Sequence, residues 1–177
     1  MVTLATALFA AAACSPQQDS ERFAADLVPV NGSGATGRVS LDLDGNLLAV
    51  MVDASGVEPE RVHPQHIHGF DDGRQATCPT PGADSNGDGI VDAAEAETAY
   101  GPVRVPLAPF PTTRAQPDLR FSLLYMAPGG DLAYPFTVEV DQLRSLQGRH
   151  IVLHGLTVDG IYRMDVPVAC GEIRRSG

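Results

Sequence analysis

Alternating apolar and polar residues recur along most of the chain and predict a protein built of short β-strands. Between residues 38 and 44, Val39, Leu41 and Leu43 fall on one face and polar residues on the other, which is the two-residue period of a half-buried strand. Further strands are predicted at 23–30, 47–53, 121–126, 136–140, 149–154 and 161–168, with a short extended segment at 64–68. About eight strands separated by turns indicate an all-β fold, a Greek-key antiparallel barrel or sandwich.

Helices are expected in only two places. Residues 93–100 are predicted as two helical turns that end before Gly101, and residues 141–147 as a second short helix. The segments 70–83 and 103–111 contain Gly or Pro and no hydrophobic period, so we expect them to be irregular. The chain of 177 residues suits one domain.

The N-terminal segment has the features of an export signal. Residues 4–13 are uncharged and apolar, too short a run to span a bilayer, and they lead into Cys14. This resembles a bacterial lipoprotein signal, although no Lys or Arg precedes the apolar run. We therefore expect a signal peptide at 1–14, lipidation of Cys14, a polar linker at 15–22 and a folded domain at 23–177 in the periplasm or at the cell surface. The alternative is an ordinary cleaved signal in which Cys14 is incidental.

The charge of the chain restricts its partners. The formal net charge is −10, so nucleic acid and anionic membrane surfaces are poor partners, whereas cations are suitable ones. Membrane contact is expected only through the lipid anchor. Apart from Cys14 the chain has two cysteines, Cys78 and Cys170, which in an exported domain most simply form one disulfide; two buried free thiols are the alternative.

Two histidines on the short segment 64–68 are candidate metal ligands. His66 and His68 are two residues apart, so on a strand they share a face with Cα atoms about 6.6 Å apart, and both imidazoles can reach one ion. His63 is an odd number of residues from both and is expected on the opposite face. His150 and His154 share a face about 13 Å apart, too far for both to bind the same ion. A satisfied pair of surface or core histidines is the alternative to a metal site.

Three motifs, including the segment of these two histidines, together resemble motifs of copper–zinc superoxide dismutases. They are the segment 63–69 with its histidines, the segment 148–154 that begins Gly-Arg and ends at His154, and the closing Ala-Cys-Gly-x-Ile of residues 169–173. The order and approximate spacing hold from about residue 23 to residue 173. The resemblance implies a Greek-key β-barrel, a Cys78–Cys170 disulfide, and copper ligation by His66, His68 and His154.

The chain departs from that family at the positions that carry the reaction. Asp84 stands where the family has the histidine shared by copper and zinc, and no histidine lies between 68 and 150, so no zinc is expected. Pro167 stands where the family has the arginine that guides superoxide. Two interpretations remain. In one, the protein is a non-catalytic metal-binding or structural lipoprotein on the same fold; in the other, it is an active copper-only superoxide dismutase that protects the cell envelope.

The segment 84–95 matches a twelve-residue calcium loop. Side-chain oxygens are predicted from Asp84, Asn86 and Asp88, and Gly89 permits the sharp turn. The remaining predicted ligands are the backbone carbonyl of Ile90, Asp92 through water, and a bidentate Glu95. We expect calcium to order residues 78–100, where the superoxide dismutases have their zinc loop. An acidic, Gly-rich turn without an ion is the alternative.

Overall fold

The computed structural model of the chain describes residues 20–107, 128–139 and 145–177. Its strands are β1 (Glu21–Pro29), β2 (Thr36–Asp44), β3 (Leu47–Ser55), β4 (Gln65–His68), β5 (Val103–Pro106), β6 (Asp131–Glu139), β7 (His150–Val158), β8 (Ile161–Glu172) and β9 (Arg174–Arg175). The helices are the 3₁₀ turns η1 (Pro81–Ala83) and η3 (Pro128–Gly130) and the α-helix α1 (Ala93–Tyr100). Within the described residues no helix is long and apolar enough to cross a membrane.

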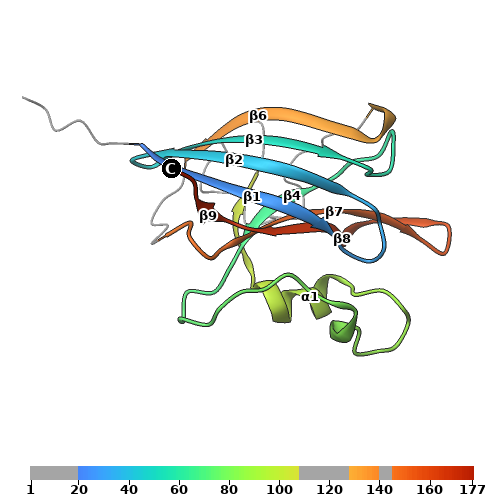
Figure 1. Cartoon of the computed structure of the whole chain (residues 1–177). Coiled ribbons are helices and arrows are strands. Elements are labelled where there is room, and N and C mark those ends of the chain that lie inside the picture. Colours follow the sequence, from blue (N-terminus) through green and yellow to red (C-terminus); the bar gives the residue numbers. More distant parts are fainter. Residues whose placement is uncertain (1–19, 108–127, 140–144) are drawn as a thin grey trace, which may run out of the picture.

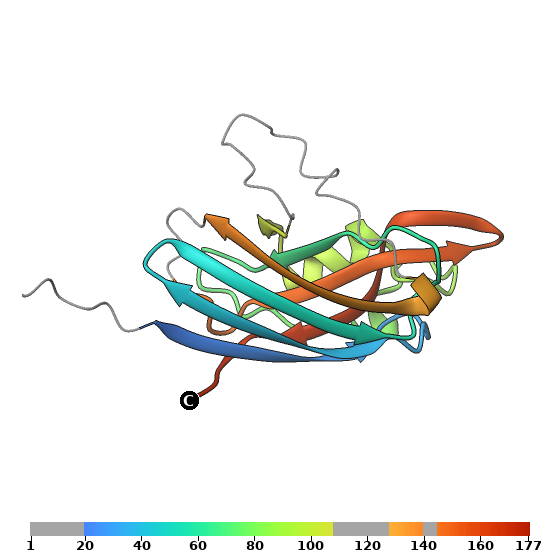
Figure 2. The same ribbon diagram turned by 90° about the horizontal axis from the view of Figure 1, so that it is seen from above.

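The described strands form one antiparallel sheet that curls into a half-barrel. The strand order is β5-β4-β7-β8-β1-β2-β3-β6, with β9 paired to β1. Strands β1, β2, β3 and β6 form one wall, and β4, β7 and β8 form the other (Figure 1). Seen from above, the first wall lies across the second (Figure 2). Strand β1 belongs to both walls because its Val28 and Pro29 pair with β8. The prediction of an all-β antiparallel fold is therefore confirmed.

The core lies between the two walls, and the two-residue period of the strands produces it. Along β3, even-numbered residues are buried and odd-numbered ones exposed, and β2 pairs with it so that Val39 lies opposite Val52 and Leu41 opposite Val50. The opposite wall contributes Ile67 from β4, which is fully buried. Burial of each such side chain stabilises the fold by roughly 1.5–3 kcal/mol.

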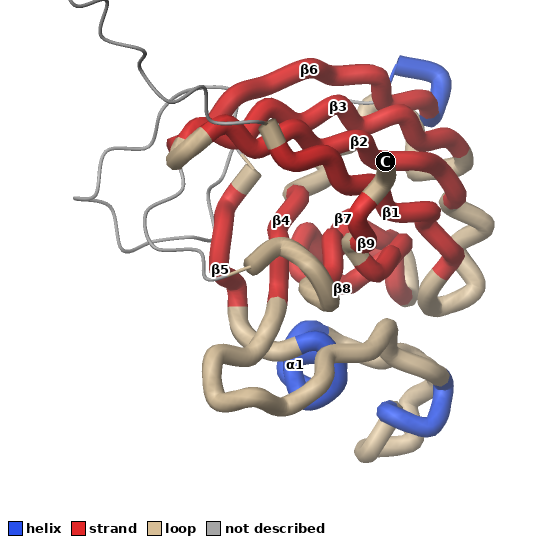
Figure 3. The backbone as a smooth tube through the Cα atoms, turned by 60° about the vertical axis from the view of Figure 1, so that its left-hand side comes forward, coloured by secondary structure: helices blue, strands red, loops and turns tan. Residues whose placement is uncertain are grey.

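A second layer covers the outer face of β4, β7 and β8. The segment 69–102, which includes η1 and α1, folds back over these strands (Figures 1 and 3). A smaller apolar cluster lies between them, formed by Val30, Val91, Ala96, Tyr100, Val152 and Cys170. Asp71 also joins this segment to the sheet, because its carboxylate oxygens lie 2.8 Å from Arg104 and 2.9 Å from Arg149. This layer encloses the outer face of the sheet.

Helix α1 has a capped N-terminus and ends before the glycine that the sequence indicated. The Asp92 side chain accepts hydrogen bonds from the backbone N–H groups of Ala94 and Glu95, and Glu95 accepts one from the N–H of Asp92, which is a capping box. The helix ends at Gly101, whose φ of 83° lies in the left-handed region that favours glycine. The predicted bounds 93–100 are confirmed.

Other predicted elements differ in extent or type. Strand β7 continues past its predicted end at 154 into a hairpin around Asp159 and Gly160, and β8 continues past its predicted end at 168 to Glu172. Residues 103–106 were expected to be irregular, and this prediction is wrong. They form strand β5, because Val105 pairs with Ile67 at the free edge of β4. Residues 145–148 form a turn and no helix. The predicted strand 121–126 and most of the predicted helix 141–147 lie outside the described residues.

Candidate metal centre

Three predicted ligands come together on the outer face of the sheet. His66 and His68 lie on one face of β4, and His66 pairs with Val152 of β7, so even-numbered residues of β7 share that face. His154 is two residues further along β7, and its backbone N–H donates to the carbonyl of Pro64. The pairing of β7 with β8 shifts on both sides of His154. This irregularity sets the position of His154 beside the pair on β4.

The three imidazoles form a compact, buried cluster. One ring nitrogen from each of His66, His68 and His154 lies within 4.8 Å of the other two. The ring centroids are 5.0 Å apart for His66 and His154, 5.6 Å for His66 and His68, and 5.7 Å for His68 and His154. The three residues are between 4% and 8% exposed.

Hydrogen bonds to backbone carbonyls fix the orientation of two of these rings. Nδ1 of His68 lies 2.9 Å from the carbonyl oxygen of Gly101, and Nδ1 of His154 lies 3.0 Å from that of Asp165. A carbonyl only accepts, so each Nδ1 carries the proton and each Nε2 presents a lone pair. Both Nε2 atoms are buried without a hydrogen-bond partner among the described residues. Such an arrangement is typical of metal-binding histidines.

Burial keeps the imidazoles of His68 and His154 neutral. Burial, followed by the proximity of His154, lowers the pKa of His68 to about 3. Burial lowers the pKa of His154 to about 4, although the carbonyl and carboxylate of Asp165 oppose this shift. Only a neutral imidazole binds a metal. The three residues therefore fit a transition-metal ion with imidazole ligands.

A pocket of about 830 Å³ leads to the cluster. Its described lining includes Glu97, Tyr100, Arg163, Met164 and Asp165 in addition to the three histidines. The Tyr100 ring packs against the His68 ring with 4.2 Å between centroids. The lining also includes residues 162–165 of β8, close to its hairpin with β7.

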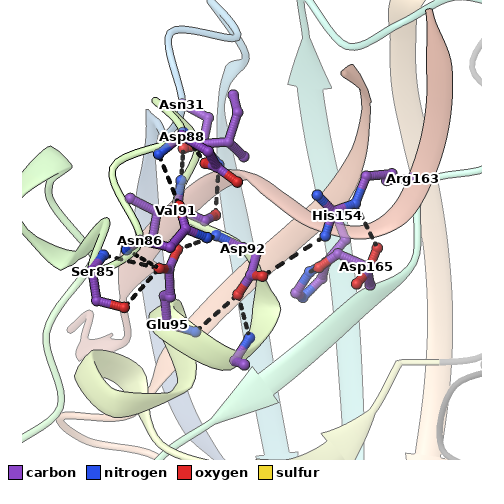
Figure 4. A network of polar contacts seen from close by, with 12 residues as sticks. Asn31, Ser85, Asn86, Asp88, Val91, Asp92, Glu95, His154, Arg163 and Asp165 are labelled. Atoms are coloured by element: carbon purple, nitrogen blue, oxygen red, sulfur yellow. Dashed lines mark hydrogen bonds and ion pairs between the residues drawn. The ribbon is translucent and has the colours of Figure 1, made fainter. Parts of the chain in front are cut away.

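Among the described lining residues of this pocket, Arg163 carries a guanidinium, and Glu97 and Asp165 carry carboxylates. Arg163 lies 3.8 Å from the Asp165 carboxylate and 3.9 Å from that of Asp92, which caps α1 (Figure 4). Both carboxylates compensate the charge of Arg163, and Glu97 adds a further negative charge to the lining. Pro167, at the position where a guiding arginine was expected, pairs with His154 in the sheet. The local field therefore favours a cation over a small anion.

Two residues that support the cluster were not predicted from the sequence. His63 is fully buried, with one ring nitrogen 2.9 Å from the carbonyl oxygen of His154 and the other 2.8 Å from that of Glu58. It lies outside the cluster, but it holds the backbone of a cluster residue. No sequence pattern indicated that Tyr100 lies beside the cluster, because its contact with His68 depends on how α1 packs on the sheet.

The acidic loop 84–95 forms a compact, hydrogen-bonded turn. The Asp84 carboxylate accepts hydrogen bonds from the N–H groups of Gly87 and Gly89, at 2.7 and 2.8 Å. The Glu95 carboxylate accepts from Ser85 and from the N–H groups of Asn86 and Asp92, and these bonds lower its pKa (Figure 4).

The other predicted calcium ligands are also engaged within the loop. Asn86 and Asp88 each accept a backbone hydrogen bond from the residue two positions on. Among the described residues, groups of three or more close metal-binding atoms occur at the three histidines and at Cys78, His150 and Cys170 only. Calcium binding at Asp84, Asn86, Asp88, Ile90, Asp92 and Glu95 stays a prediction.

The disulfide is present as expected. Cys78, in the covering segment, is bonded to Cys170 of β8, and their Cα atoms are 5.7 Å apart. The bond links residues 92 positions apart and fixes the covering segment to the sheet. His150 lies beside it on β7 and is 3% exposed, and burial lowers its pKa. Cys14 lies outside the described residues.

Comparison with known proteins supports the fold. No protein-family model matches the chain, and no curated protein sequence matches it. Among solved structures the chain is similar to a point mutant of superoxide dismutase 5 from Candida albicans. The TM-score is 0.50 with 15% sequence identity, over 89% of this chain and 90% of the other. The chain thus has a fold like that of a superoxide dismutase over most of its length, together with a buried cluster of three histidines.

Proposed function

We propose that the protein is an exported copper-binding protein in which His66, His68 and His154 hold the metal. The observation that carries this proposal is the pair of buried, unpartnered Nε2 atoms of His68 and His154, which lie within 4.8 Å of each other and of a ring nitrogen of His66. Three imidazoles suit several divalent ions, and copper is at the top of their affinity order. The resemblance of the segments 63–69 and 148–154 to motifs of copper–zinc superoxide dismutases implies the same metal.

Other residues of the chain orient the metal-binding imidazoles and place negative charge at the pocket. Gly101 and Asp165 fix the tautomers of His68 and His154, so that little reorganisation accompanies metal binding. Glu97 and Asp165 raise the local concentration of cations at the pocket. Copper bound there would supply one-electron redox chemistry.

The experiment is copper titration of the oxidised protein, purified without chelator. We expect one copper ion per chain, with affinity reduced by at least about 100-fold in His66→Ala, His68→Ala or His154→Ala, beyond the effect typical of outer-shell changes. His150→Gln is the matched control, since this buried histidine lies on the same strand as His154 but outside the cluster. Equal affinity in the wild type and the three alanine variants would contradict the proposal.

Superoxide dismutation is the second candidate function, and one observation favours it. The pocket that reaches the three histidines also contains a guanidinium, that of Arg163. However, Asp92 and Asp165 flank this group and the net charge of the chain is −10, so a small anion is not steered into the pocket. We therefore expect dismutase activity far below the diffusion ceiling of about 10⁸–10⁹ M⁻¹s⁻¹. A copper-loaded sample near that ceiling would make dismutation the primary function.

Export and calcium binding belong to the same proposal. The signal-like segment 1–14 and the Cys78–Cys170 disulfide support an extracytoplasmic location, with Cys14 as the lipidated residue. Mass analysis of the mature N-terminus distinguishes lipidation from simple cleavage. Calcium at the loop 84–95 is supported by the ligand pattern and by Gly87 and Gly89, whose positive φ values of 74° and 87° allow the loop to turn.

A further inference from the structure

A second group of metal-binding side chains lies beside the three histidines, on the same outer face of the sheet. The Sγ atoms of Cys78 and Cys170 and a ring nitrogen of His150 all lie within 4.8 Å of one another. His150 is opposite His68 in the pairing of β7 with β4, whereas Cys170 is opposite Val152 on the other side of β7. The two groups are thus neighbours that share no residue.

One atom of this group lacks the interaction that its burial requires. Nδ1 of His150 is buried and has no hydrogen-bond partner among the described residues. The residue is 3% exposed, so water does not readily replace that partner. The sulfur atoms nearby are joined in a disulfide, which carries no proton to donate and does not act as a thiolate ligand. The oxidised protein therefore leaves a buried polar nitrogen unsatisfied.

We propose that Cys78, Cys170 and His150 form a redox-gated site for a d¹⁰ divalent ion of the zinc class. A thiol reductant breaks the S–S bond: two thiols give two electrons and two protons and become a disulfide, while Cys78 and Cys170 become thiols. Metal binding then displaces the two cysteine protons. A disulfide oxidant reverses the sequence: it takes two electrons from the two thiolates and two protons from solvent, the Cys78–Cys170 bond forms again, and the ion is released.

The charge and ligand types of the group fit this ion. Two thiolates and a divalent cation sum to zero charge, which suits a buried site. Two cysteines and one histidine, with a fourth position for water or another ligand, are an established zinc set. Cys170 is fully buried, and burial keeps His150 neutral and able to bind. This proposal does not depend on copper at His66, His68 and His154.

The test uses cobalt(II) as the optical probe, on the full chain with Cys14→Ser so that only two cysteines remain. Thiolate-to-cobalt charge-transfer bands report sulfur ligation and are silent for the three-histidine site. The protein reduced with a phosphine should show these bands with one thiolate-bound ion per chain, and the oxidised protein should show none. His150→Phe and His150→Gln should weaken the thiolate-bound ion by at least about 100-fold. His66→Ala should leave the bands unchanged.

If the protein stays folded on reduction, two outcomes would overturn the proposal. One is a reduced protein that stays folded by circular dichroism but gives no charge-transfer bands. The other is an unchanged cobalt affinity in both His150 variants, which would show that this histidine is not a ligand. If reduction alone unfolds the domain, zinc should restore folding in the wild type and not in His150→Phe, because metal-binding free energy becomes folding free energy. Failure of zinc to do so would also overturn it.

Discussion

Acidification from pH 7 to pH 5 should destabilise the metal-free protein through its buried histidines. In an unfolded chain a histidine has a pKa near 6.5, whereas in the folded protein the pKa is about 3 for His68 and about 4 for His154. Between these values the unfolded state binds more protons than the folded state, so stability falls as pH falls. The loss begins near pH 6.5 and continues until the folded-state pKa values are reached.

The magnitude follows from the two shifts. At pH 5 the solution is about 1.5 pH units below the pKa of a histidine in the unfolded chain. Protonation therefore stabilises the unfolded state by about 2 kcal/mol for each such residue. His68 and His154 together should therefore lower the free energy of unfolding by about 4 kcal/mol, a large share of the roughly 5–15 kcal/mol typical of a domain. The carboxylates with lowered pKa values, such as Glu172, titrate at lower pH and contribute little in this range.

Urea unfolding of the metal-free protein at pH 7 and pH 5 measures this loss directly. The variant His68→Leu is the control, because it should lose the contribution of His68, about 2 kcal/mol, while it keeps an apolar side chain in the buried position. Equal midpoints at the two pH values in the wild type would refute the argument. So would an undiminished pH dependence in the variant, since the titrating groups would then lie elsewhere.

Three further predictions concern the disulfide, the acidic loop and the buried histidine outside the cluster. Cys170→Ser should destabilise the fold by about 4–5 kcal/mol, the chain-entropy value for so long a loop, and denaturant unfolding of metal-free protein measures it; a loss under 1 kcal/mol would contradict the expectation. Millimolar calcium should raise the melting temperature of the wild type but not of Asp84→Ala, and no shift at about 10 mM would count against the loop as a calcium site. His63→Ala should destabilise the fold by about 2–4 kcal/mol, because it leaves a cavity beside the buried carbonyl of His154, yet reduce copper affinity much less than loss of a ligand does. Comparison of its unfolding and copper titrations separates the two effects.

The strand pattern and the histidine spacing could be predicted because each depends on local periodicity. Alternation along 38–44 defines a strand face, and the i, i+2 spacing of His66 and His68 places both on one face. The addition of His154 and the Cys78–Cys170 pairing are long-range facts. His154 was added by the resemblance of several motifs together, whereas the disulfide already followed from the two cysteines that remain besides Cys14 in an exported domain.

Other features could not be predicted because they arise from packing between distant segments. Segment 103–106 joins the sheet only because β4 offers it an edge, and its Pro106 obscured that pairing in the sequence. Tyr100 contacts His68, and His63 holds the carbonyl of His154, through positions set by the covering segment and the irregular β7. In the acidic loop, by contrast, the sequence matches a calcium-ligand pattern. In the structure these side-chain oxygens accept hydrogen bonds from backbone N–H groups of the same loop.

Anomalous diffraction at the copper edge, on crystals of the oxidised, copper-loaded protein, tests the central claim most directly. The structure predicts one anomalous peak about 2 Å, the length of a metal–imidazole bond, from Nε2 of His68, from Nε2 of His154 and from a ring nitrogen of His66. A peak bound by other residues, or no peak at these three imidazoles in fully loaded protein, would contradict the account.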